Sequence, residues 1–234
     1  MEIRIAVAKI NKYASSESGD TVETVERPNG GVSVVMADGQ SSGKGAKQVS
    51  CLVVRKVIGL LSEGVRDGAA ARAASDSLFT EKKGKVSATL NILSVDAQTG
   101  TLVITRNNPA PVLIVDSGNI RTLVEDCKPI GLYRDTRPLI NEIPLEPGLA
   151  VIIFTDGIVH AGTRDGEAMD VITCLQAMLE DEEPPAQEIA DMLLQHAIQL
   201  DQGRPVDDIS VVVLQVTSRE GDLIRRMSVQ LPLP

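Results

Sequence analysis

The chain has 234 residues, of which 43% are hydrophobic but only 2% aromatic, and its formal net charge is −9. This length is enough for one large domain, whose core must be built from aliphatic side chains. Binding to nucleic acid or to an anionic membrane surface needs clustered Lys and Arg, so an acidic chain disfavours both.

The first part of the chain predicts a hairpin and two helices. Residues 3–10 alternate as in a half-buried strand. A Pro-Asn-Gly-Gly turn separates an extended arm, 21–27, from a buried strand, 31–37, and so predicts a hairpin. Apolar residues at helical spacing over 49–61 and an Ala-rich stretch over 67–82 predict two helices.

The second part begins with a change to a period of two. Residues 86–125 predict an antiparallel meander of strands. A fully buried strand is expected at 149–154 and another central strand at 209–216. Between them, helical patterns cover 167–182 and 186–201.

The order of elements predicts the fold class. Strands, two helices, strands, two helices and a strand favour an α+β architecture in which helices pack outside the sheets. We expect a single domain over residues 1–234, with 217–234 as a C-terminal extension that adds one edge strand.

Carboxylates lie where the predicted central strands end. Asp20 ends the first loop, while Asp38 and Asp156 each follow a buried strand and are each followed by glycine. Asp207 and Asp208 directly precede the last strand. Asp-Gly is also an ordinary turn dipeptide, but its repetition beside other acids favours a shared site.

Electrostatics indicates which kind of ligand such a site binds. Carboxylates held together near an apolar core repel one another unless a cation lies between them. Hard oxygen ligands of this kind suit Mg²⁺ or Mn²⁺. The sequence therefore predicts a divalent-metal site.

These residues, taken in order, resemble the metal-dependent protein phosphatases, also called PPM or type 2C, and most closely their bacterial SpoIIE-like branch. The resemblance covers roughly residues 3–216. It is carried by Ser18-Gly19-Asp20, Ala37-Asp38-Gly39, Phe154-Thr155-Asp156-Gly157 and Asp207-Asp208-Ile209-Ser210, and is extended by Asn107-Asn108-Pro109-Ala110-Pro111 and Pro129-Ile130-Gly131-Leu132.

The resemblance implies a four-layer α-β-β-α sandwich of two antiparallel sheets flanked by helix pairs, with two Mn²⁺ or Mg²⁺ ions in a cleft at one end. Asp38 would bridge both ions and the Gly39 carbonyl would bind one. Asp156 and Asp207 would complete one ion site and Asp20 would contribute to the other.

The resemblance also implies the chemistry. Asp38 and Asp20 would be the catalytic pair, supported by Asp208 and Gly157, and water between the cations would attack phosphorus in line. The short chain resembles stand-alone phosphatases of stressosome and partner-switching signalling. The implied partner is a STAS-type protein phosphorylated on Ser or Thr, in a cytoplasmic stress-response pathway.

Two departures from the family pattern leave roles open. Gln40 stands where many eukaryotic relatives carry a histidine that is a candidate general acid. No residue clearly matches the arginine that binds phosphate in those relatives, and Arg4, Lys9 and Lys12 remain alternatives. His160 follows the third motif and is expected near the cleft.

Other classes of function fit less well. The stretch 41–46 resembles a P-loop, but its glycine spacing is one residue short and Lys44 is followed by glycine. Cys51, Cys127 and Cys174 are far apart, which argues against a zinc site and a disulfide framework. A catalytically weak pseudophosphatase that binds partners, or a metal hydrolase of small phosphoesters, remain alternatives.

Overall fold

The computed structural model describes residues 1–180, 183–219 and 221–232, and in them ten strands form two five-stranded antiparallel sheets. The first sheet has the order β1 (Glu2–Ile10), β10 (Ile209–Thr217), β9 (Ala150–Phe154), β6 (Val112–Asp116), β7 (Asn119–Leu123). The second sheet has the order β2 (Asp20–Glu26), β3 (Val32–Gly39), β4 (Ala88–Asp96), β5 (Thr101–Arg106), β8 (Leu139–Pro144).

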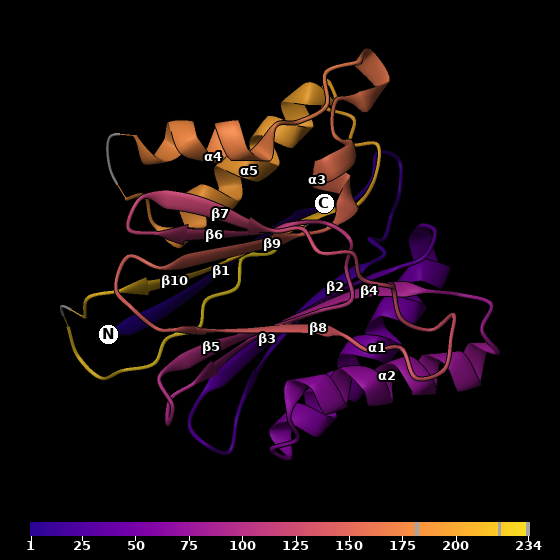
Figure 1. Ribbon diagram of the computed structural model, residues 1–234. Helices are drawn as coiled ribbons and strands as arrows, with labels where there is room; N and C mark the ends of the chain where they lie inside the picture. The colour runs from indigo at the N-terminus through magenta and orange to yellow at the C-terminus, as the bar shows by residue number, and fades with distance from the viewer. Residues whose placement is uncertain (181–182, 220, 233–234) are drawn as a thin grey trace.

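Helices cover the outer face of each sheet (Figure 1). The second sheet carries α1 (Gly43–Ser62) and α2 (Asp67–Lys82), and the first sheet carries α4 (Val171–Leu179) and α5 (Ala186–Leu200). A short helix, α3 (Asp156–His160), and a 3-10 turn, η1 (Thr163–Asp165), follow β9. The α-β-β-α sandwich and the α+β class are confirmed.

Three hydrophobic clusters hold the four layers together, and the alternation of side chains along each strand explains them. On β3, Val34 and Met36 pack between the sheets, while Val35 and Ala37 pack against α1 and α2. Because both faces of the inner strands are covered, β10 is buried along residues 209–216 and is mostly apolar.

The strands predicted over 86–125 are present, but their assignment to a single meander is wrong. The strands β4 and β5 pair in the second sheet, whereas β6 and β7 pair in the first. The chain crosses between the sheets after Arg106. There the side chain of Asn108 donates through Nδ2 to the carbonyl oxygen of Phe154 and accepts through Oδ1 from the backbone amide of Ala110. Period-two patterning reports a strand but not the sheet to which it belongs.

Sequence patterns also missed β8, α3 and the 3-10 turn η1, and added one strand. The edge strand β8 was missed because Ile143 is its one buried residue, and α3 because it has only five residues. The predicted edge strand after Ser218 is wrong for the described residues 218–219 and 221–232, which form none. Residues 181–182 of the predicted helix over 167–182 lie outside the described residues.

None of the helices among the described residues has the length and apolar character needed to cross a membrane.

Candidate metal centre

The hairpin of β2 and β3 brings two of the predicted ligands together. Asp20 is the first residue of β2 and lies directly opposite Asp38 in the antiparallel register. Directly opposed residues on neighbouring strands have Cβ atoms about 5 Å apart. The structure therefore places two carboxyl groups side by side at one end of the second sheet.

The first sheet supplies the other two. Asp156 begins α3 immediately after β9, and Asp207 lies two residues before β10. Both are close enough to Asp38 to raise its pKa by repulsion. We call Asp20, Asp38, Asp156 and Asp207 the candidate metal centre, which lies between the ends of the two sheets.

The carboxyl groups of the candidate metal centre are poorly compensated. Burial, followed by repulsion from Asp20 and Asp156, raises the pKa of Asp38 to about 9. Burial also raises the pKa of Asp20 and of Asp156, and Asp207 repels the latter. Such a cluster either holds protons or binds cations.

The residues present fit divalent cations. Asp20 is fully buried, yet its Oδ1 has no hydrogen-bond partner among the described residues. In the part of the chain that the structure describes, no three acidic, His or Cys side chains are gathered closely enough to enclose an ion. Mg²⁺ commonly keeps several waters and takes only one or two carboxylates, so paired carboxylates suit it.

Binding of Mn²⁺ or Mg²⁺ is expected to stabilise the fold, by about 2.7 kcal/mol at a hundredfold excess over Kd. Because the pKa of Asp38 is raised in the folded state, the metal-free protein should lose stability as pH rises from the ordinary value of 3.8 towards about 9. Metal binding displaces the proton that Asp38 holds, and this displacement is easier at higher pH. The rise in Tm on metal binding should therefore be larger at pH 8 than at pH 5.5. Thermal denaturation with Mn²⁺ and with EDTA measures it, and equal shifts at both pH values would contradict this assignment.

Two glycines let backbone segments close around the centre. A Cβ added to Gly39 would lie 2.1 Å from the carbonyl oxygen of Ala46 in the first turn of α1. A Cβ added to Gly157 would lie 2.2 Å from the carbonyl oxygen of Asp208. Both distances are far below van der Waals contact. Glycine is therefore needed in both Asp-Gly pairs to let another backbone segment approach closely.

Asp208 braces a loop. Its Oδ1 accepts from the amide of Lys12 at 2.9 Å, and its Oδ2 accepts from the amide of Gly19 at 2.8 Å. Both oxygens are thereby used to hold the segment between β1 and β2, which carries the chain into Asp20.

Four residues hold Asp20, and for three of them, Thr155, Ser210 and Lys47, the sequence predicted no role. Its Oδ2 accepts from Thr155 Oγ1 at 3.1 Å and from Ser210 Oγ at 2.6 Å. Its carbonyl oxygen accepts from Lys9 Nζ at 3.1 Å and Lys47 Nζ at 2.7 Å. Thr155 and Ser210 stand inside the Asp156 and Asp207 motifs, so the motifs contained the signal for them.

Ser210→Ala is expected to cost roughly 1–3 kcal/mol of stability, because it removes a partner from a buried carboxylate. The Ser210 hydrogen bond lowers the pKa of Asp20, so its loss should also weaken Mn²⁺ binding by roughly 10–100-fold. Calorimetric titration with Mn²⁺ measures the affinity. Ser218→Ala, at an exposed position just after β10, is the control. Unchanged Mn²⁺ affinity in Ser210→Ala would show that Asp20 does not bind the ion.

The other residues that the sequence suggested for the site lie at different distances from it. Arg4 pairs with Glu2 in an exposed position, and Lys12 reaches the site only through its backbone amide. Gln40 is exposed and its Oε1 accepts from Ser87. His160 Nε2 lies 4.0 Å from Asp156 Oδ2. Of the three basic alternatives, Lys9 is the one whose side chain lies at the centre.

Comparison with known proteins identifies the family of the chain. The sequence model of the family "Stage II sporulation protein E (SpoIIE)" matches residues 28–217. Stage II sporulation protein E of Bacillus subtilis (strain 168) is 23% identical over 200 residues, which are 85% of this chain but 24% of that protein. The chain therefore spans about a quarter of that relative's length.

Solved structures share the fold. The PP2C phosphatase domain of SpoIIE from Bacillus subtilis, solved with a fragment of its regulatory domain, has a TM-score of 0.79 and 21% identity, over 92% of this chain and 64% of that one. The catalytic domain of the serine/threonine phosphatase PstP with two manganese ions has a TM-score of 0.71 and 17% identity, over 92% and 99%. With a family match over most of its length and this fold, the chain belongs to the SpoIIE family.

Proposed function

We propose that the chain is a metal-dependent serine/threonine protein phosphatase. The observation that carries the proposal is the convergence of four aspartates from two sheets, where burial raises the pKa of Asp20, Asp38 and Asp156. Membership of the SpoIIE family supports it, as does the manganese-bound relative of the same fold.

The proposed ligands are Asp38 and the Gly39 carbonyl, with Asp20 on one side and Asp156 and Asp207 on the other. When bound, a pair of Mn²⁺ or Mg²⁺ ions supplies Lewis acidity and lowers the pKa of water. Thr155 and Ser210 fix the orientation of the Asp20 carboxylate, while Lys9 and Lys47 fix its backbone.

Substrate phosphate is held next to a cationic side chain in this arrangement. Burial and the neighbouring Lys47 lower the pKa of Lys9, whose ammonium already donates to the Asp20 carbonyl. A compact ammonium binds phosphate as a point charge. We assign Lys9 to charge compensation of the phosphoryl group, the role that the sequence left open.

The proposed substrate class is a phosphoserine or phosphothreonine protein, and the resemblance to partner-switching phosphatases favours a STAS-type signalling protein. The test is release of phosphate, with Mn²⁺, from a STAS-domain protein phosphorylated on serine and from a phosphotyrosine peptide. We expect turnover of the former and much slower turnover of the latter. Hydrolysis of small phosphoesters without turnover of any phosphoprotein would move the assignment to a small-molecule phosphatase.

A pseudophosphatase is the alternative from another functional class. Folded protein that binds Mn²⁺ but turns over no phosphorylated substrate would establish it.

A further inference from the structure

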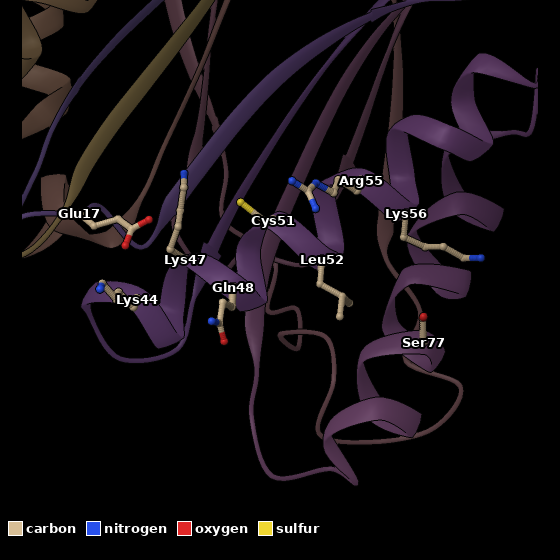
Figure 2. Close-up of a pocket in the computed structure, with 9 residues that line it drawn as sticks. All are labelled: Glu17, Lys44, Lys47, Gln48, Cys51, Leu52, Arg55, Lys56 and Ser77. Carbon is tan, nitrogen blue, oxygen red and sulfur yellow. The ribbon is translucent and has the colours of Figure 1, made fainter. Parts of the chain in front are cut away.

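One face of α1 carries a cationic groove beside the candidate metal centre. A cavity of about 860 Å³ is lined by Lys44, Lys47, Arg55 and Lys56, with Cys51 and Leu52 between them. Figure 2 shows these residues along α1, with Glu17 beyond the N-terminal end of the row and Ser77 on the neighbouring α2. We call this surface the α1 groove.

Helix geometry sets the length of the α1 groove. Lys47 and Arg55 follow Lys44 by three and eleven residues, spacings that keep these three cations on one side of the helix, and Lys56 directly follows Arg55 at the C-terminal end of the lining. At about 1.5 Å per residue, the row from Lys44 to Lys56 is about 18 Å long. An extended peptide rises about 3.3 Å per residue, so the groove matches about five or six residues of peptide.

The charge of the α1 groove is uncompensated. The helix contains four cations and no acid, in a chain whose net charge is −9. Lys44, Arg55 and Lys56 are exposed, and none of the four cations forms a salt bridge with any residue in the described ranges 1–180, 183–219 and 221–232. Glu17 is the one acid in the lining. A row of free cations attracts an anionic partner.

The α1 groove begins at the candidate metal centre. Lys47 Nζ donates to the carbonyl of Asp20 at 2.7 Å and to Thr21 Oγ1 at 3.0 Å. Arg55 lies eight residues further along the helix, about 12 Å away. A chain whose phosphorylated residue enters the metal centre can therefore continue along α1.

We propose that the α1 groove docks an extended, acidic segment of the phosphoprotein substrate, next to its phosphorylated Ser or Thr. The occupant is acidic because three of the cations that line the groove, Lys44, Arg55 and Lys56, are exposed, and its apolar side chains rest on Leu52. The inference rests on the proposed function and adds to it a determinant of substrate choice.

The test compares two phosphoserine peptides of equal length, one flanked by Asp and Glu and one by Asn and Gln. Wild-type protein should have a kcat/KM about tenfold higher for the acidic peptide, and the preference should fall with added salt. Arg55→Glu with Lys56→Glu should remove the preference and leave p-nitrophenyl phosphate turnover unchanged. Arg72→Glu with Arg121→Glu is the control, because it changes the net charge equally at exposed positions outside the groove.

Fluorescence anisotropy with an unphosphorylated acidic peptide separates docking from catalysis. Groove-dependent binding without turnover of any phosphate ester would overturn the proposed function and leave docking standing. Equal kcat/KM for both peptides in the wild type, with p-nitrophenyl phosphate hydrolysed, would overturn docking alone. Tighter, groove-dependent binding to phosphatidylserine vesicles than to the peptide would overturn the choice of partner.

Discussion

Asp38→Asn is expected to lower phosphate release by about a thousandfold without unfolding the protein. Asp38 is the residue at which the charges of both sheets meet, since Asp20, Asp156 and Asp207 all act on it. Asparagine keeps the shape but removes the charge that would bridge the two ions. The rate with saturating Mn²⁺ and p-nitrophenyl phosphate measures the effect.

The same substitution should leave the metal-free protein as stable as the wild type or more stable. With its pKa raised from 3.8 to about 9, Asp38 must take up a proton on folding at the pH values between, which lowers stability as pH rises, and asparagine removes that cost. Asp116→Asn, at the exposed end of β6, is the control. A large loss of Tm in Asp38→Asn without metal would show that the carboxylate stabilises the fold.

Gly39→Ala is expected to destabilise the protein by roughly 1–3 kcal/mol, the cost of forcing extra volume into a packed site. The new methyl group would lie 2.1 Å from the Ala46 carbonyl oxygen, which belongs to backbone and cannot rotate away. Displacing the first turn of α1 should also move Lys47 from the Asp20 carbonyl, and so weaken Mn²⁺ binding. Chemical denaturation and calorimetric titration measure the two effects.

Gly45→Ala is the matched control for Gly39→Ala. It lies six residues further along the chain, in the first turn of α1, and a Cβ there meets no atom within 4 Å. Alanine should therefore stabilise the helix by about 0.5–1 kcal/mol. Equal stability of the two variants would contradict close packing between Gly39 and α1.

The sequence could predict the inner strands because both their faces are covered. Strand β9 is wholly apolar and β10 mostly so, and the motifs at their ends located Asp156 and Asp207. The sheet that each strand joins was beyond the pattern, so the meander was misassigned. Edge strand β8 left too weak a pattern, because it exposes most of its residues.

The sequence predicted the aspartates of the candidate metal centre but not the hydroxyl residues that hydrogen-bond to Asp20. Repelling carboxylates beside glycine are visible in a sequence because few other arrangements need them. The hydrogen bonds from Thr155 and Ser210 to Asp20 depend on how two sheets meet, and small hydroxyl residues in strands carry no distinctive spacing. The α1 groove likewise needed the helix to be placed beside β2.

The most direct test of the account is hydrolysis of p-nitrophenyl phosphate by the wild-type protein during titration with Mn²⁺, followed by EDTA and by excess Mn²⁺. We expect a rate that rises with Mn²⁺, falls to background with EDTA and returns when the metal is restored. Turnover that persists in EDTA, or no turnover from folded protein that has bound the metal, would contradict a metal-dependent phosphatase.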